Sequence, residues 1–120
     1  MPRIAQTLCV AAVPLLLAGC ATSGSEQDGR VTEQWQGRWN GPEGTYLDIT
    51  GTPADYRLTI ADLDGPRRFV GRAQGGQIVF VRDGVLERIR ASDGEATGMK
   101  WLLDKQNCLT VRSGEGYCRD

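Results

Sequence analysis

The sequence predicts an all-β fold: a small antiparallel β-barrel or a flattened sandwich of seven or eight short strands, with one disulfide. Turn-forming pairs rich in Gly, Pro and Asp recur at intervals of about ten residues between residues 41 and 114. The segments between these turns alternate hydrophobic and polar residues, as half-buried strands do. Two cysteines near the C-terminus flank a strand, a turn and a returning strand. Because an open sheet of this size would expose an apolar face and two edges, the strands must close on themselves or pack face to face.

Residues 1–19 have the parts of a secretory signal. Arg3 supplies an early positive charge, residues 4–18 are mainly apolar, and small residues precede Cys20. The apolar run is shorter than the ~20 residues that a membrane-spanning helix needs, and it contains Pro14. We therefore expect residues 1–19 to be a cleaved signal peptide.

The four residues Leu17-Ala18-Gly19-Cys20 resemble the lipobox of bacterial lipoproteins. This resemblance implies that the Cys20 thiol receives a diacylglyceryl group, that the signal is cut before Cys20, and that the new amino group is acylated. In Gram-negative members an Asp after the cysteine marks retention in the inner membrane, so Ala21 implies an anchor in the outer membrane. The domain would then lie in the periplasm or at the cell surface. An ordinary signal peptide with a chance cysteine is the alternative.

Residues 20–33 are predicted to form the lipidated cysteine and a flexible tether. Ser, Gly, Thr and charged residues dominate this stretch, and Val31 is its one aliphatic residue apart from Ala. It therefore contains too little apolar surface to order itself. The small β domain is predicted to span residues 34–120.

The predicted strands lie between the turn signals. Residues 45–49 and 56–60 alternate hydrophobic and polar side chains. Asp83-Gly84 separates residues 78–81 from residues 85–89 and is the strongest hairpin signal, because both turn residues tolerate positive φ. The turn signals are Gly41-Pro42, Gly51-Thr52-Pro53, Asp64-Gly65-Pro66, Gly75-Gly76, Asp83-Gly84, Asp93-Gly94 and Ser113-Gly114.

Residues 95–105 are ambiguous. Ala96, Met99, Leu102 and Leu103 have helical spacing, but Gly98 interrupts it. The segment is expected to be either a short helix or an irregular crossover.

Cys108 and Cys118 are expected to form the disulfide. Cys9 leaves with the signal and Cys20 is lipidated, so these two remain in an exported protein. Two thiols without any histidine make a poor zinc site, so no metal is expected. No cofactor is expected apart from the covalent lipid on Cys20.

The charge balance indicates which partners are unfavourable. Loss of Arg3 with the signal leaves a net charge near −2, and the two signs are interleaved along the chain. This balance argues against nucleic acid or anionic lipid as an electrostatic partner. The anchor, the tether, the disulfide and the missing catalytic groups instead favour an envelope protein as the partner, with a small ligand as a second option.

Three local patterns mark candidate residues. Gly37 and Trp39 resemble the Gly-x-Trp opening of lipocalin and avidin-type barrels, which implies an aromatic plug at the closed end; the alternative is a plain core aromatic. Thr97, Lys100 and Trp101 lie in a segment that resembles part of the membrane-bound c-type lysozyme inhibitors, small lipoprotein barrels whose corresponding Ser enters the enzyme cleft.

The third pattern is a glycine-flanked acidic turn beside the disulfide. Glu115 and Tyr117 lie there, and a rigid acidic loop of this kind can insert into a partner's cleft at low entropic cost. The alternative is a tight turn in which Glu115 is simply solvated.

Catalytic residues are not indicated. The chain has no histidine, no cysteine free after lipidation and oxidation, and no Gly-x-Ser-x-Gly elbow. The sequence therefore predicts a noncatalytic outer-membrane lipoprotein that binds a macromolecule, with an inhibitor of a lytic enzyme or protease as the sharpest version. The alternatives are a lipocalin-like carrier or sensor of a small apolar ligand, and a structural subunit of an envelope complex.

Overall fold

The computed structural model describes residues 29–120. The predicted signal peptide, the predicted lipidation site Cys20 and the tether up to residue 28 lie outside the described residues. Within residues 29–120, no helix has the length and apolar character that crossing a bilayer requires.

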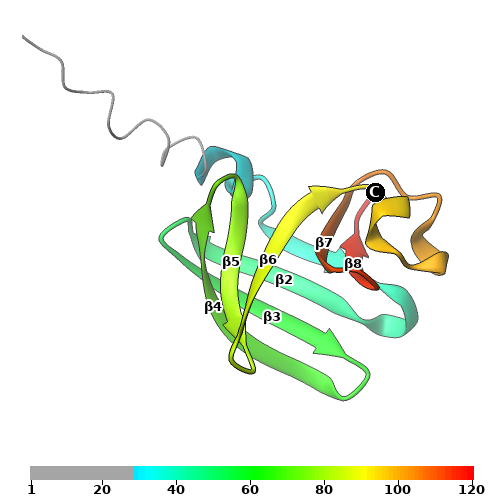
Figure 1. Cartoon of the computed structure of the whole chain (residues 1–120), viewed down its shortest axis with the longest axis horizontal. Helices are drawn as coiled ribbons and strands as arrows, with labels where there is room; N and C mark the ends of the chain where they lie inside the picture. Colours follow the sequence, from blue (N-terminus) through cyan, green and yellow to red (C-terminus); the bar gives the residue numbers. More distant parts are fainter. Residues whose placement is uncertain (1–28) are drawn as a thin grey trace, which may run out of the picture.

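The described residues form a closed barrel of antiparallel strands, each paired with its neighbours in the sequence (Figure 1). The strands are β1 (Gly37–Asn40), β2 (Tyr46–Thr52), β3 (Asp55–Asp62), β4 (Gly65–Gln74), β5 (Gln77–Arg82), β6 (Val85–Ser92), β7 (Cys108–Arg112) and β8 (Glu115–Cys118). Pairing of β1 with β8 closes the ring. The predicted all-β barrel is confirmed, and the flattened sandwich is excluded.

The predicted turns join the strands. Asp83 and Gly84 have φ values of 53° and 79°, so both residues of the β5–β6 turn are left-handed. Since successive turns of a meander alternate between the two ends of the barrel, the turns after β3, β5 and β7 lie together at one end. We call this end the mouth, and the opposite end the closed end.

Inward-facing side chains fill the barrel. Alternate residues of the strands are buried, and one cluster joins Trp39, Leu47, Ile49, Tyr56, Leu58, Ile60, Ile78, Phe80, Ile89, Leu109, Val111 and Tyr117. Trp39 is 2% exposed, which confirms it as a core residue. Gly37 begins β1 with a φ of 104°, a conformation that disfavours any side chain.

The closed end is covered by residues that precede β1. Residues 29–33 form a helical turn, and the buried Thr32 hydroxyl lies 2.8 Å from the Tyr56 hydroxyl as a hydrogen-bond partner. Trp35 is also buried in the barrel core. Residues 29–33, predicted as part of the tether, therefore pack on the barrel, because a buried Thr can dock a polar segment by hydrogen bonding.

The connection between β6 and β7 contains two single-turn 3₁₀ helices, η3 (Glu95–Thr97) and η4 (Lys100–Leu102). Both alternatives for residues 95–105 are thus partly correct: the segment is irregular and contains short helical turns. It packs on the outer face of β7 and β8, where Met99 and Leu102 cover the disulfide in a second apolar cluster.

The predicted disulfide is present. Cys108 and Cys118 are direct register partners on β7 and β8, and their sulfur atoms are bonded. The bond therefore joins the last two strands on the outside of the barrel, away from the main core.

The seam between β1 and β8 is short. Asn40 and Cys118 are the single register pair that joins them. Arg119 reinforces this seam, since its guanidinium donates to the carbonyl oxygens of Gln34 and Gln36 and lies 3.9 Å from the Trp39 ring centroid. One side chain thus fastens the end of the last strand to the start of the first.

Candidate functional site

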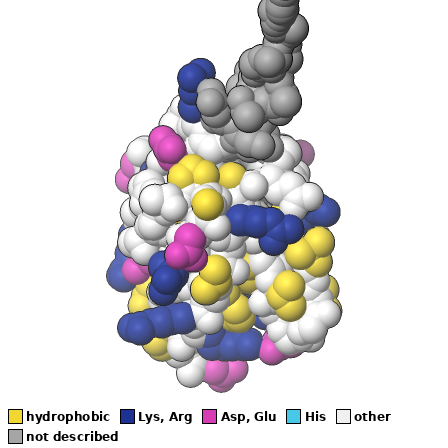
Figure 2. All heavy atoms as spheres, turned by 90° about the vertical axis from the view of Figure 1, so that its left-hand side faces the viewer, with side chains coloured by type: hydrophobic (Ala, Val, Ile, Leu, Met, Phe, Trp, Pro, Cys, Tyr) yellow, Lys and Arg dark blue, Asp and Glu magenta, His cyan; other side chains and the backbone are white. Residues whose placement is uncertain are grey.

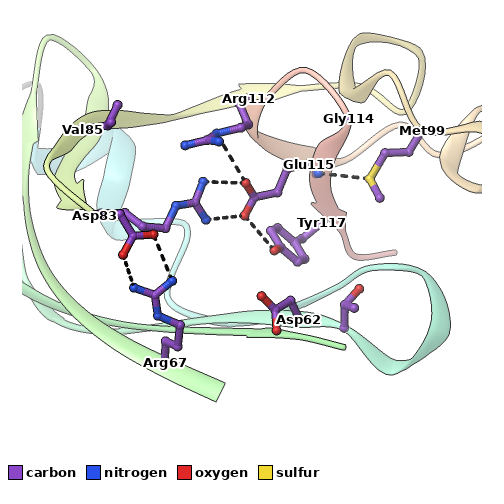
Figure 3. A pocket seen from close by; sticks show the side chains of 12 residues that line it. Asp62, Arg67, Asp83, Val85, Met99, Arg112, Gly114, Glu115 and Tyr117 are labelled. Carbon is purple, nitrogen blue, oxygen red and sulfur yellow. Dashed lines mark hydrogen bonds and ion pairs between the residues drawn. The ribbon is translucent and has the colours of Figure 1, made fainter. Parts of the chain in front are cut away.

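The mouth of the barrel holds a cavity of about 500 Å³ (Figure 3). Residues at the turns after β3, β5 and β7 line it, together with the start of β4 and residues 115–117 at the start of β8. Its charged side chains are Asp62, Arg67, Arg82, Asp83, Arg112 and Glu115. Three guanidinium groups and three carboxylates thus face one cavity.

Arg82 forms the floor of the mouth. Its guanidinium donates to Glu115 Oε1 and Oε2 at 2.7 and 2.8 Å and to Glu87 Oε2 at 2.8 and 3.0 Å. The side chains of Arg82 and Glu87 are only 11% and 6% exposed. Because an unpaired buried charge is very unfavourable, these groups hold one another in place.

Arg112 and Tyr117 complete the floor. Arg112 forms ion pairs with Glu87 and, at 3.9 Å, with Glu115. The Tyr117 hydroxyl donates to Glu115 Oε2 at 3.1 Å, and burial raises the pKa of this phenol well above its ordinary value. The hydrogen bond from Arg82 to Glu115 raises the pKa of the guanidinium, which therefore stays charged. The floor is rigid and nearly neutral.

Arg67 and Asp83 form the rim. The guanidinium donates to the two Asp83 oxygens at 2.7 and 3.2 Å and joins β4 to the β5–β6 turn. This hydrogen bond lowers the pKa of Asp83 and raises that of Arg67. Both side chains are about half exposed or more, so the pair orients the rim without burying it.

The turn predicted as an acidic partner-binding tip has a different structure. Its backbone is the predicted tight turn between β7 and β8. Glu115, however, points into the mouth and is paired with Arg82, while Tyr117 is 4% exposed (Figure 3). Glu115 is therefore neither a free acidic tip nor a solvated turn residue. It could meet a partner only within the mouth.

The residues predicted from the 97–101 segment are split by the fold. Thr97 is fully buried; its hydroxyl donates to the Gly94 carbonyl at 2.6 Å and accepts from the Met99 amide at 3.1 Å. It cannot reach a partner, because its methyl side packs close to Gly116 of β8. Lys100 and Trp101 are exposed, and Trp101 is 71% accessible.

Arg82, Glu87 and Arg112 were not predicted as site residues. A signal for two of them lies in the alternation of the predicted hairpin: Ile78 and Phe80 share a face with Arg82, and Ile89 shares a face with Glu87. Charged residues at inward positions indicate a buried ion pair or a cavity. Arg112 follows a register irregularity in β7, which the sequence does not reveal.

Among residues 29–120, no group of three His, Cys, Asp or Glu side chains is arranged to hold a metal ion. Comparison of the chain with protein-family models, with curated proteins and with solved structures found no match.

Proposed function

We propose that the protein is a noncatalytic lipoprotein, anchored in the outer membrane through lipid on Cys20, whose barrel mouth binds a protein partner in the cell envelope. The observation that carries this proposal is the position of the mouth relative to the N-terminal side of the domain. The chain reaches the barrel at the closed end, through residues 29–33 (Figure 1). The residues that line the cavity lie at the other end.

This polarity suits an anchored binding domain. Eight residues separate Cys20 from residue 29, which allows a reach of at most about 30 Å from the lipid. A barrel tethered at its closed end leaves its mouth free of the tether, where a soluble or membrane-bound partner can meet it.

The mouth is also preorganised for charged groups. Arg82, Glu87 and Glu115 fix one another, so a partner's charged side chain would meet oriented groups rather than flexible ones. The more accessible charges are Asp62, the rim pair Arg67 and Asp83, and Arg112, whose side chain is 52% exposed. An inhibitor of a lytic enzyme or protease, inserting one or more turns of the mouth into a cleft, is the sharpest form of this proposal.

The apolar-carrier alternative gains no support from the mouth, since charged side chains line its cavity. Trp39, which motivated that alternative, is packed in the main core beneath Arg119.

A crosslinking pulldown from native membranes tests the proposal. The intact protein is compared with Cys20→Ser, which cannot be lipidated, with Asp62→Lys in the mouth, and with Glu33→Lys near the closed end as a charge-matched control. One abundant partner should be captured by the intact protein and by Glu33→Lys, and lost with Cys20→Ser and Asp62→Lys. Capture that survives Asp62→Lys would refute binding at the mouth.

The inhibitor version has a separate test. The purified full-length protein is mixed at micromolar concentration with c-type lysozyme and with serine and metalloproteases. Inhibition that weakens with Asp62→Lys is expected. Unchanged activity of every enzyme would eliminate this version while leaving the pulldown result standing.

A further inference from the structure

We propose that the outer wall formed by β3 to β6 is a docking surface for an anionic lipid bilayer, separate from both the mouth and the lipid on Cys20. The first observation is a concentration of arginines. Alternation along these strands turns Arg57, Arg68, Arg72, Arg88 and Arg90 outward, and all of them are exposed. We call this surface the arginine face.

The arginine face lacks compensating acids. Glu87 is the one acidic residue within β4, β5 and β6, and it is 5% exposed and points inward to Arg82. Asp83 in the β5–β6 turn is paired with Arg67. Within residues 29–120, the ion pairs closer than 4 Å include Arg57 with Asp55 but none that involves the other four arginines of the face.

Exposed aliphatic side chains lie among the arginines. Val70, Val81 and Leu86 are 61%, 59% and 52% exposed, and Leu86 is the register partner of Val81. Figure 2 looks onto the side of the barrel that carries β4 and β5 and shows basic and hydrophobic side chains interspersed, with some acidic side chains among them. The surface is therefore both cationic and apolar.

A hollow of about 430 Å³ lies on the same face. Arg57 and Arg68 line it together with the threonines at positions 50 and 59 and with Val70. Two guanidinium groups and two hydroxyl groups supply hydrogen-bond donors to a phosphate, while the valine adjoins an apolar chain. The hollow thus has the donors and the room for a phospholipid headgroup.

The combination of arginines and exposed aliphatic side chains favours a bilayer over a soluble polyanion as the partner of the arginine face. Binding of single-stranded nucleic acid relies on guanidinium contacts to phosphates and on exposed aromatic side chains that stack with bases. The large hydrophobic side chains exposed on the arginine face, Val70, Val81 and Leu86, are instead aliphatic. Arginines that attract anionic headgroups, beside aliphatic residues that enter the interface, are the two components of peripheral membrane binding.

The net charge of the chain does not oppose this inference. The acidic excess is a sum over the whole sequence, whereas binding depends on the local potential. The fold gathers four arginines without ion pairs on one wall, buries Glu87 and pairs Asp83 with Arg67, so the field near β4 to β6 is positive.

Vesicle cosedimentation tests the inference. The full-length chain carries Cys20→Ser, so that no acyl chain contributes, and is mixed with vesicles of phosphatidylcholine alone or of equimolar phosphatidylcholine and phosphatidylglycerol. The quantity measured is the ratio of the affinities for the anionic and the neutral vesicles, because the uncleaved N-terminal segment contributes to both. Arg68→Gln/Arg88→Gln removes two charges from the arginine face, and Arg30→Gln/Lys100→Gln removes two exposed charges elsewhere.

The ratio of the affinities for anionic and neutral vesicles should fall about thirty-fold in Arg68→Gln/Arg88→Gln, since each arginine contributes about five-fold. It should fall much less in Arg30→Gln/Lys100→Gln. Added salt should reduce the preference of the parent chain in the same way. Equal affinity for the two vesicle types would overturn the proposal. So would equal losses in the two variants, or binding to soluble polyphosphate without binding to anionic vesicles.

Discussion

Replacing Arg82 by Met would test whether the floor of the mouth supports the fold. Met keeps much of the side-chain volume but leaves the carboxylates of Glu87 and Glu115, with side chains 6% and 21% exposed, without their main cation. Removing one partner of a buried ion pair costs about 3–5 kcal/mol. Because Arg112 remains beside Glu87 and the Tyr117 hydroxyl still donates to Glu115, we expect a loss near the lower limit, about 3 kcal/mol.

Urea unfolding followed by tryptophan fluorescence provides the measurement. With an m-value of about 1–3 kcal/mol per molar, the midpoint of Arg82→Met should fall by roughly 1–3 M. Arg67→Met is the matched control, because its ion pair with Asp83 lies at the exposed rim and should contribute little. A variant as stable as the control at neutral pH would refute the view that this network supports the barrel.

Three further outcomes are expected. Arg119→Ala should lower the free energy of unfolding by about 2 kcal/mol, because the seam loses two hydrogen bonds and a cation–π contact, and Arg119→Lys should recover only part of it. Reduction of the Cys108–Cys118 bond, ten residues apart, should lower thermal stability by about 2.5–3 kcal/mol, with no effect of reductant on the Cys108→Ser/Cys118→Ser variant. Burial raises the pKa of Tyr117 in the folded state, so the stabilising effect of the neutral phenol is complete below pH ~10 and is lost as the pH rises toward the folded-state pKa. Tyr117→Phe should therefore reduce the loss of unfolding free energy at alkaline pH, as measured by unfolding at increasing pH.

The features predicted correctly are those that nearby residues determine. Asp83-Gly84 tolerates positive φ at both turn positions, so the hairpin was visible without knowledge of the rest of the chain. Regular turn spacing implied a meander, and a sheet this small has to close on itself or pack face to face. Cys108 and Cys118 flank one hairpin, so their pairing followed from the same local pattern.

The features that were missed depend on packing between distant segments. From the sequence, Thr97 is predicted to be an accessible polar residue. In the structure it is buried against Gly116 of β8, which has no side chain to exclude it. From the sequence, Glu115 is predicted to be exposed at the tip of a turn. In the structure it faces the mouth, because it accepts hydrogen bonds from Arg82, 33 positions earlier in the chain. Helical docking of residues 29–33 similarly depends on Tyr56.

The arginine face was missed for a different reason. Charges that alternate in sign along a sequence suggest a mixed surface, but a strand sends neighbouring residues to opposite faces. Glu87 and Arg88 are adjacent in sequence, yet one enters the core and the other points to solvent. Neither the net charge nor the order of charges along the sequence therefore reveals that the pleated strands place the arginines on the outer face and Glu87 on the inner face.

The seam has a consequence for how the chain could be rearranged. Since Asn40 pairs with Cys118 and Arg119 donates to the Gln34 carbonyl, the segment just before β1 lies beside the residues that follow β8. Every other strand contact joins sequence neighbours, so the ring has no intrinsic starting strand. A circular permutant that joins these ends with a short linker and opens at Gly75-Gly76 would keep all eight pairings while moving the N-terminus to another hairpin. Which strand comes first therefore depends only on which turn is opened. A reporter or second domain could be attached at several turns without interrupting a strand.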